Sequence, residues 1–380
     1  MTMKDPEKDP SQMRRGYTTG ANATAATKAA LLALITQEPV QSVEILLPIG
    51  ETIAFQMVCC GVETDRAVCG VIKDAGDDPD ATHLALILAE VSWVQGENSG
   101  EIHLDGGIGV GRVTKPGLPV PVGEAAINPV PRRMIRKVAA DLLNEYGITQ
   151  NVRIVISVPK GVEIAKKTLN ERLGIVGGIS ILGTKGIVVP FSTAAYQASV
   201  VQAIKVARAG GCDHLVLTTG GSSEKYAMKL YPELPQEAFI QMGDFVGFSL
   251  RHAKRQGASQ VSLVGMMGKF SKIAQGVMMV HSKSAPVDFG FLAEVAADCG
   301  APPDLLAEIQ TANTATQVGD LMQGAGLGIF FEKLCGHACR HSLDEVGGGL
   351  RVETVLTTMK GDLLGRGAID ERNSCDRDRG

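Results

Sequence analysis

The residues of this sequence that could do chemistry gather in a few short polar stretches, and the first lies near the N-terminus. Arg14 and Arg15 precede Gly-Tyr-Thr-Thr-Gly and a long run dominated by alanine. Alanine favours helix and Thr18 or Thr19 is a natural N-cap, so we expect a helix that begins near Gly20. The unpaired N–H groups at a helix start attract a carboxylate or a phosphate. A well-capped packing helix explains the same residues, and on local chemistry alone it is the stronger interpretation.

Two glycine-rich turns in the second half of the chain could hold a ligand against the backbone. They are TTGG at residues 218–221 and GMMGK at residues 265–269, and each follows a predicted strand. Ligands of open parallel sheets bind beyond the carboxyl ends of the strands, where glycine permits close approach and the next helix offers N–H donors. Neither turn matches GxGxxG or the Walker A pattern, and tight strand-to-helix turns are the alternative. The positions predicted to bind the ligand are Thr218, Gly220, Gly221, Gly265 and Gly268.

An acidic run lies between two predicted strands and ends in a histidine. It reads DAGDDPDATH at residues 74–83. Carboxylates and a histidine close together could exchange protons with a substrate. The glycine and the distal glutamate of a calcium-binding loop are misplaced here, so calcium is not predicted. Aspartate and Pro-Asp are also ordinary turn residues, and without further information a solvated turn is the stronger interpretation.

Four potential metal ligands form the pattern CxHxCxH near the C-terminus. They are Cys335, His337, Cys339 and His341. The segment 329–343 is predicted to be helical, which places the two cysteines on one side and the two histidines on nearly the opposite side. Four ligands spread in this way cannot converge on one ion, so we predict no protein-bound metal.

Composition describes an ordinary globular protein of two or three domains. The chain has 380 residues, 44% of them hydrophobic and 21% charged, with a net charge of −4. Aromatic residues make up only 4%, and there is no basic stripe, which argues against nucleic-acid binding. No apolar run approaches the ~20 residues that span a bilayer, and no secretory signal is visible. The eight cysteines are scattered, which is typical of reduced thiols in the cytoplasm, so we expect a cytoplasmic protein without a membrane partner.

The elements that must position these residues fall into two predicted domains of an α/β fold. Residues 14–148 alternate in polarity with short turns, which predicts an α+β domain with a largely antiparallel sheet and a closing helix at 131–146. Residues 149–365 alternate strands and helices, which predicts a Rossmann-like domain with a parallel sheet and a helical C-terminal part. We place the boundary near residues 147–151, and we expect residues 1–13 and 366–380 to be disordered tails.

Several of these stretches, taken in order, resemble the sequence blocks of one known family. GYTTGANATAATKAA is similar to the opening signature of the CbiD family, the cobalt-precorrin-5B (C1)-methyltransferases of anaerobic cobalamin (vitamin B12) biosynthesis. The resemblance covers most of the chain from Arg14 to about His281 and is looser beyond it. The further blocks are GDDPDATH, GEIHLDGGIGVGRVTKPG, AAINPVPRRMI, LGIVGGISILGTKGIVVPFS, GDFVGF and SLVGMMGKFSKIAQGV.

The resemblance implies a reaction and assigns roles to the candidate residues. It implies S-adenosylmethionine as the methyl donor, which we assign to the glycine turns, and a cobalt-corrinoid substrate that brings its own cobalt. This substrate carries acetate and propionate groups, which arginine forks match. The implied substrate-binding residues are Thr18, Thr19, Gly20, Arg132, Arg133 and Lys269, and the implied catalytic residues are Asp77, Asp78, Asp80 and His83.

Two other functions and one structural question stay open at this point. A nucleotide-dependent oxidoreductase could use a parallel sheet of this kind, although GxGxxG is missing. A non-catalytic tetrapyrrole or cobalt carrier would bind the corrinoid without turnover. The sequence does not fix the oligomeric state, and a homo-oligomer is compatible with it.

Overall fold

The computed structural model describes residues 12–96, 99–281 and 285–372. The chain divides into two compact units, Met1–Thr193 and Ala194–Gly380. Residues 1–11 and 373–380, which form most of the two expected tails, lie outside the described ranges. Residues 366–370, which we had assigned to a tail, instead belong to a strand that ends at Asp370.

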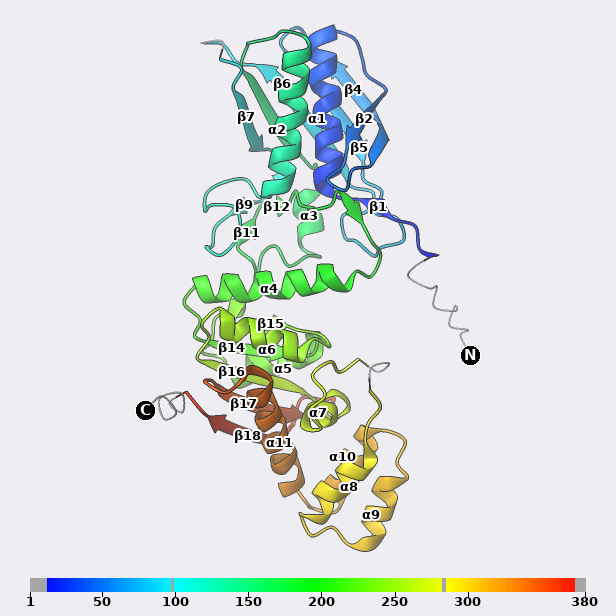
Figure 1. Cartoon of the computed structure of the whole chain (residues 1–380), viewed down its shortest axis with the longest axis vertical. Helices are drawn as coiled ribbons and strands as arrows, with labels where there is room; N and C mark the ends of the chain where they lie inside the picture. The colour runs from blue at the N-terminus through cyan, green and yellow to red at the C-terminus, as the bar shows by residue number, and fades with distance from the viewer. Residues whose placement is uncertain (1–11, 97–98, 282–284, 373–380) are drawn as a thin grey trace. The chain divides into compact units, whose positions relative to one another are not determined.

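The first unit is built on a five-stranded sheet covered by two long helices (Figure 1). Three of the four strand pairings are antiparallel, and only β10 and β7 run parallel. The strands in spatial order are β4 (Cys59–Val62), β5 (Arg66–Ile72), β6 (Leu86–Trp93), β10 (Val152–Ser157) and β7 (Ile102–Gly106). The helices are α1 (Thr19–Thr36) and α2 (Pro129–Glu145). The largely antiparallel sheet predicted for this half is therefore present.

Short strand pairs and a short helix complete the first unit. The antiparallel pairs are β1 (Gly16–Tyr17) with β13 (Ile187–Val188), β2 (Ser42–Leu46) with β3 (Thr52–Gln56), and β9 (Arg112–Val113) with β11 (Ile175–Val176). The parallel pair is β8 (Gly109–Val110) with β12 (Gly178–Ile179), and α3 (Gly161–Ala165) lies between β10 and β11 in the chain.

Alanine explains how α1 can be buried on nearly all sides. Ala21, Ala25 and Ala29 have no exposed surface, and the alanine side chain is small enough for other backbone to approach closely. Gly20 is needed for the same reason, since a Cβ there would lie 2.6 Å from the ring of Pro131 at the start of α2. The sequence predicted this helix and its start correctly, and its packing role is evident.

Three glycines bring separate loops of the first unit into direct backbone contact. A Cβ on Gly109 would lie 1.9 Å from the carbonyl oxygen of Val158, and Gly161 and Gly178 each meet the carbonyl oxygen of Gly109. Gly109 also has φ of +71°, a conformation that other residues rarely adopt. The motif GGIGVG at residues 106–111 therefore serves packing at this junction.

The second unit is built on a sheet whose first four strands run parallel (Figure 1). The last strand, β18 (Leu363–Asp370), runs antiparallel to β17. The strands in order are β15 (Phe239–Gln241), β14 (His214–Thr218), β16 (Gln260–Met266), β17 (Arg351–Thr357) and β18. The helices are α4 (Thr193–Ala209), α5 (Gly221–Leu230), α6 (Val246–Arg255), α7 (Met267–Ala274), α8 (Phe289–Ala297), α9 (Pro303–Gln310), α10 (Ala315–Gly324) and α11 (Ile329–Val346).

The structure confirms the α/β fold class but moves the division between its parts. We had placed the boundary near residues 147–151, where strands begin to alternate with helices. In the structure β10 pairs with β6 and β7 and so completes the first sheet. The strand expected at residues 186–189 is β13, which pairs with β1 near the N-terminus. Residues 152–193 therefore belong to the first unit. Within the described residues, no helix has the length and apolar character needed to cross a membrane.

Candidate functional site

At the carboxyl edge of the second sheet, the connections that leave two neighbouring strands lead to opposite sides of the sheet. From β14 the chain passes through α5 to β15 on one side, whereas β16 is followed by β17 on the other side. The ends of β14 and β16 are neighbours, with Thr218 opposite Val264. In open α/β sheets, ligands bind at such a reversal because the loops diverge there and leave room. Both glycine-rich segments singled out in the sequence lie at the ends of these strands: TTGG connects β14 to α5, and GMMGK covers the end of β16 and the start of α7.

The predicted glycine positions differ in how much space surrounds them. A Cβ on Gly220 or on Gly268 would meet no atom within 4 Å, so both leave open space next to the backbone. A Cβ on Gly265 would lie 2.9 Å from the ring of Phe270, so this glycine makes room for the protein's own core. Thr218 is buried and its hydroxyl donates to the Ile240 carbonyl. Gly221 is the first residue of α5, so its N–H stands at a helix start.

Lys269 ties together the loops that follow three of the parallel strands. Its Nζ lies 2.9 Å from a carboxylate oxygen of Asp244, which comes after β15. The same Nζ donates to the Thr219 carbonyl, 3.2 Å away, after β14. Lys269 itself lies on α7, which follows β16. The sequence predicts that this lysine binds substrate, and in the structure it joins Asp244 and Thr219 at the edge of the sheet.

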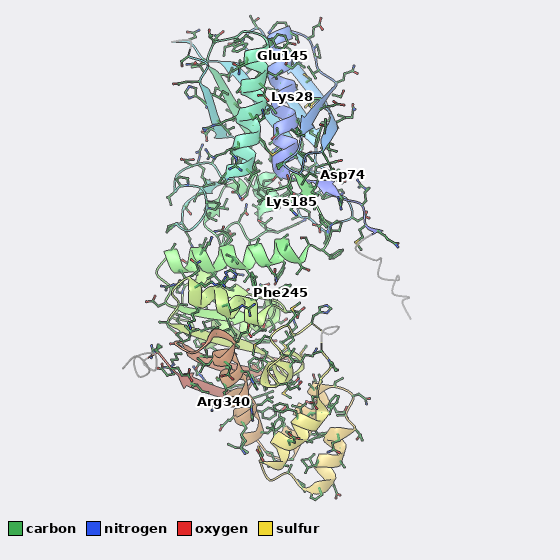
Figure 2. All side chains as sticks on the ribbon, viewed as in Figure 1. Lys28, Asp74, Glu145, Lys185, Phe245 and Arg340 are labelled. Carbon is green, nitrogen blue, oxygen red and sulfur yellow. The ribbon has the colours of Figure 1, made fainter. Side chains whose placement is uncertain are left out.

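Polar residues that the sequence analysis passed over complete this edge. The Gln241 side chain donates to a Glu224 carboxylate oxygen at 2.8 Å, and the Tyr196 hydroxyl donates to the Gln241 carbonyl at 3.2 Å. Burial, followed by the charges of Asp244 and Glu224, raises the pKa of Tyr196. The ring of Tyr196 packs at 5.6 Å from that of Phe245, which lies beside α4 (Figure 2). The sequence did offer a signal for Asp244. It is an acidic residue about 20 positions beyond the TTGG turn, the spacing at which such sheets often place a ribose-binding carboxylate.

In the first unit, the acidic run is part of a loop that fastens the N-terminal segment. The Arg14 guanidinium pairs with both carboxylate oxygens of Asp74, one of them at 2.9 Å, and Asp77 accepts from the Arg14 backbone N–H at 2.9 Å. The hydrogen bond from Arg14 lowers the pKa of Asp74 to about 2. Asp74 and Lys185 both lie toward the N-terminal end of α1 (Figure 2). The loop and the start of α1 are thus one local structure.

Asp80 pairs with a lysine that is almost completely buried. Lys73 has 1% of its side chain exposed, and its Nζ lies 2.7 Å from Asp80 Oδ2. The other oxygen of Asp80 accepts from the Thr82 backbone N–H at 2.7 Å and from its hydroxyl at 2.6 Å. Burial raises the pKa of Asp80, but the charge and hydrogen bond of Lys73 and the bonds from Thr82 outweigh it, so the net shift is downward.

The remaining two candidates of the acidic loop are closer to solvent. Asp78 accepts from the backbone N–H of Phe191 at 2.9 Å, where Phe191 has φ of +53°. His83 is exposed, and its Nδ1 accepts from the Ala75 N–H at 3.1 Å. The loop therefore gathers all four predicted catalytic residues, and each also has a structural contact.

The start of α1 is closed by the protein itself. The Gly20 N–H donates to the Leu182 carbonyl at 3.0 Å, and the Ala21 N–H donates to the Thr18 hydroxyl at 3.2 Å. The Thr19 hydroxyl accepts from the Leu182 N–H at 2.8 Å. All three residues of the predicted anion site are buried. Thr18 is one of the two N-caps that the sequence offered, and the N–H groups of Gly20 and Ala21 bond to the protein itself.

Because Thr18 caps α1, we expect Thr18→Ala to lower the free energy of unfolding by about 1 kcal/mol. The Ala21 N–H loses its acceptor in a buried place. Denaturant unfolding of the full chain measures this loss. The matched control is Thr36→Ala, whose hydroxyl donates to Leu32 in an exposed last turn, and which should differ from wild type by less than about 0.5 kcal/mol. If Thr18→Ala leaves the free energy of unfolding unchanged but weakens substrate binding, Thr18 acts in substrate binding instead of capping.

The two arginines predicted to hold substrate carboxylates differ in their surroundings. The Arg132 guanidinium donates to the carbonyls of Ile127 and Ala125, at 2.7 and 3.0 Å, and pairs with Glu124 at 2.8 Å. Arg133 is exposed on α2. Arg132 therefore anchors the turn before α2, and Arg133 is the better placed of the two to meet a ligand.

The CxHxCxH segment forms the helix that the sequence predicted, α11. Cys335 and Cys339 are buried, and burial raises the pKa of Cys335 to about 12 and that of Cys339 to about 11. His337 packs edge-on against Phe291 at 5.5 Å, and His341 lies 3.9 Å from Asp344. Among the described residues, no group of three or more potential ligands is arranged to hold a metal ion.

The candidate residues thus form two groups, one in each compact unit. The acidic loop, the start of α1, Arg132 and Arg133 lie in the first unit, and the glycine turns with Lys269 lie in the second. Each group is locally connected by the contacts described above.

Comparison with known proteins gives one consistent family. The family model described as CbiD matches residues 6–190, and the model of the CbiD C-terminal domain matches residues 279–368. Proteins named cobalt-precorrin-5B C(1)-methyltransferase include one from Priestia megaterium, 64% identical over 96% of this chain and 98% of that protein, and one from Geobacillus kaustophilus, 63% identical over 96% and 98%. A crystal structure of the cobalamin biosynthesis protein cbiD from Archaeoglobus fulgidus is 28% identical, covers 83% of this chain and 85% of that one, and has a TM-score of 0.38.

Proposed function

This chain belongs to the CbiD family, and from that we propose that it catalyses the reaction for which its relatives are named, methylation of cobalt-precorrin-5B at C1. The observation that carries this conclusion is 64% identity over 96% of the chain and 98% of the Priestia megaterium protein. The protein is a methyltransferase and its substrate is a small corrinoid. The name shared by the relatives disfavours the two alternatives, an oxidoreductase and a carrier.

The methyl donor we propose is S-adenosylmethionine, bound at the carboxyl edge of the second sheet. The chain reversal between β14 and β16 supports this place, because ligands of open α/β sheets bind at such points. Open space beside Gly220 and Gly268 supports it as well, since a ligand could contact the backbone there. The first N–H groups of α5 and α7 would face the polar part of such a ligand.

Asp244 and Glu224 are suited to bind the sugar of this donor. A carboxylate after the second strand of a βαβ unit commonly accepts hydrogen bonds from ribose hydroxyl groups. Asp244 follows β15 and is held by Lys269 at 2.9 Å, so its direction is fixed before a ligand arrives. The Gln241 side chain fixes Glu224 in the same way, at 2.8 Å.

The reaction requires the protein chiefly to hold two ligands in line. The donor supplies a methyl group on a positively charged sulfur; C1 of the corrinoid attacks that carbon, the carbon–sulfur bond breaks, and its electron pair stays on sulfur. The products are cobalt-precorrin-6A and S-adenosylhomocysteine, and the cobalt belongs to the substrate. Alignment of the two reactants and exclusion of water account for much of the rate in reactions of this kind.

The acidic loop is our candidate for a contribution to the chemical step, and Asp78 is its most informative member. Positive charge leaves sulfur and develops on the macrocycle, so a nearby carboxylate lowers the barrier. We expect Asp78→Asn to lower the single-turnover methylation rate at least tenfold, about 1.4 kcal/mol of barrier. Asparagine keeps the oxygen that accepts from Phe191, so the melting temperature should stay near that of wild type. Rapid-quench assays with labelled donor measure the rate.

The control for Asp78→Asn is Asp141→Asn, which removes a carboxylate paired with Lys137 on the exposed face of α2. This variant should methylate at the wild-type rate. We expect Asp80→Asn and His83→Ala to slow the folded enzyme less than Asp78→Asn does. If Asp78→Asn methylates at the wild-type rate in single turnover, the loop has a structural role and takes no part in the chemical step.

The proposed function itself is tested with the purified full chain, cobalt-precorrin-5B and methyl-labelled S-adenosylmethionine. We expect one labelled methyl group per corrinoid, located at C1 by mass spectrometry and NMR. Binding of the corrinoid without label transfer would favour a carrier. Consumption of a nicotinamide cofactor in place of the labelled donor would favour an oxidoreductase.

A further inference from the structure

Two cysteines of the first unit face each other across neighbouring strands. Cys60 on β4 and Cys69 on β5 are direct partners in the antiparallel register, and their sulfur atoms are 2.6 Å apart. Both belong to the core face of the sheet that packs against α1. The mechanism proposed above uses neither thiol, and both are free cysteines.

The strand geometry brings these two residues closer than the hydrogen-bonded pairs of the same ladder. The Glu63 N–H donates to the Arg66 carbonyl at 2.7 Å, so residues 63 and 66 form a hydrogen-bonded pair. Hydrogen-bonded and non-hydrogen-bonded pairs alternate along an antiparallel ladder, which makes Cys60 and Cys69, three steps further, a non-hydrogen-bonded pair. Such pairs have Cα atoms about 4.5 Å apart, within the range that a disulfide spans.

A third thiol lies beside this pair but points to the other face. Cys59 is exposed and lies opposite Gly70, with its sulfur 2.7 Å from where a Cβ of Gly70 would be. Successive side chains of a strand point to opposite faces, so Cys59 is turned away from Cys69. The pair that can close is therefore Cys60 with Cys69.

We propose that Cys60 and Cys69 form an oxidisable dithiol that closes into a cross-strand disulfide when the protein meets a peroxide. Both sulfur atoms already lie side by side, so closure needs only a small movement of the side chains. The site is independent of the methyl-transfer reaction. Its reagent is hydrogen peroxide or an alkyl hydroperoxide.

Burial assigns different roles to the two thiols. Cys60 is half-buried and lies on β4, the edge strand of the sheet, so a small oxidant can reach it. Cys69 is buried without exposed surface, and burial, followed by its contact with Cys60, raises its pKa. Cys60 is therefore the residue that attacks, and Cys69 is the residue that resolves the product.

The reaction balances with one peroxide and no other reactant. The Cys60 sulfur attacks a peroxide oxygen, the O–O bond breaks, and hydroxide takes the thiol proton and leaves as water. The Cys69 sulfur then attacks the sulfur of the resulting sulfenic acid, the S–O bond breaks, and a second water leaves with the Cys69 proton. Two thiols are oxidised to one disulfide while one hydrogen peroxide is reduced to two waters, or one alkyl hydroperoxide to one alcohol and one water.

Closure would clamp β4 to β5 just before the acidic loop. β5 ends at Ile72, and the next residue is Lys73, the buried partner of Asp80. A crosslink removes conformations from the unfolded chain, so the oxidised protein should melt at a higher temperature than the reduced protein. Reducing agent should restore both the thiols and the lower melting temperature.

The test treats the full chain with hydrogen peroxide, blocks remaining thiols with iodoacetamide and maps tryptic peptides. Cleavage at Arg66 separates Cys60 from Cys69, so a disulfide between them links two peptides and removes two hydrogen atoms from their combined mass. We expect this linked product in wild type and in Cys59→Ser. It should be absent from Cys69→Ser and from Cys60→Ser.

The Cys59→Ser variant decides which thiol of the first peptide is involved, because Cys59 and Cys60 lie together on it. Loss of the linked peptides in Cys59→Ser would overturn the assignment to Cys60. Full alkylation of all three thiols in peroxide-treated wild type would overturn the proposal altogether. The wild-type and Cys59→Ser maps suffice for this decision even where the other two variants fail to fold.

Discussion

Replacing Asp80 with asparagine should lower the free energy of unfolding by about 3–5 kcal/mol, the cost of removing one partner from a buried ion pair. The lysine that would be left behind, Lys73, has 1% of its side chain exposed and lies 2.7 Å from Asp80. Its charge would remain in the interior without a counter-ion, which is far more costly than losing an exposed pair. Denaturant unfolding of the full chain, followed by a spectroscopic signal from the first unit, measures the loss.

The effect of pH on this pair has a definite sign. The pKa of Asp80 is lowered in the folded protein, because Lys73 and Thr82 outweigh the opposing effect of burial. A group with a lowered folded pKa stabilises the protein above its unfolded pKa, about 3.9 for aspartate, and loses that contribution as pH falls through the folded value. The stability difference between wild type and Asp80→Asn should therefore be full at pH 7 and shrink below pH ~4.

Two further variants separate the ion pair from general damage to the loop. Asp77→Asn keeps an oxygen that can accept from the Arg14 N–H and is exposed, so it should change stability by less than about 0.5 kcal/mol. Replacing both partners, Lys73→Met with Asp80→Leu, should recover much of the loss, because no buried charge is then left alone. If the single variant Asp80→Asn is as stable as wild type, the ion pair with Lys73 does not stabilise the fold as we predict.

Replacing Gly220 with valine should weaken binding of S-adenosylhomocysteine about 100-fold, or roughly 2.7 kcal/mol. Gly220 has φ of 166°, an extended conformation open to any residue, and a Cβ there meets no protein atom within 4 Å. Valine can therefore be accommodated by the fold while it fills the space that we assign to the ligand. Calorimetric titration of the full chain measures the affinity.

The matched control for Gly220→Val is Gly61→Val. Gly61 on β4 also has no atom within 4 Å of a Cβ, and it belongs to the first unit. It should leave the affinity for S-adenosylhomocysteine unchanged. Gly265→Val is a poor probe of the same site, because its side chain would collide with the Phe270 ring and alter the packing of α7. If folded Gly220→Val binds S-adenosylhomocysteine with unchanged affinity, the donor site does not include Gly220.

The parts of the fold that follow from local sequence were predicted well. Helix α1 begins at Thr19 behind the cap Thr18, because alanine content and capping residues act over a few positions. Helix α11 was predicted over its Cys/His segment for the same reason, since the apolar spacing is read within the helix itself. The parallel strands β14, β15 and β16 were predicted from their alternation with helices.

The parts that depend on distant partners could not be predicted. Strand β10 looks like the first strand of the second sheet, yet it pairs with β6 and β7, and no local signal names those partners. The ion pair of Asp80 with the buried Lys73 could not be predicted either, because nothing in the sequence places these two side chains together. Arg132 was predicted to bind substrate carboxylates, and its bonds to backbone carbonyl groups could not be foreseen because such acceptors carry no sequence signature.

Photolabelling of the wild-type chain with methyl-labelled S-adenosylmethionine tests most directly where the donor binds. Ultraviolet irradiation attaches the label to residues in contact with the donor, and peptide mapping then locates them. We expect the label on peptides that contain residues 218–224 or 265–269, at the ends of β14 and β16, with protection by excess S-adenosylhomocysteine. Protected label that lies only on the first unit, for example at residues 106–112, with none at residues 218–224 or 265–269, would contradict the account.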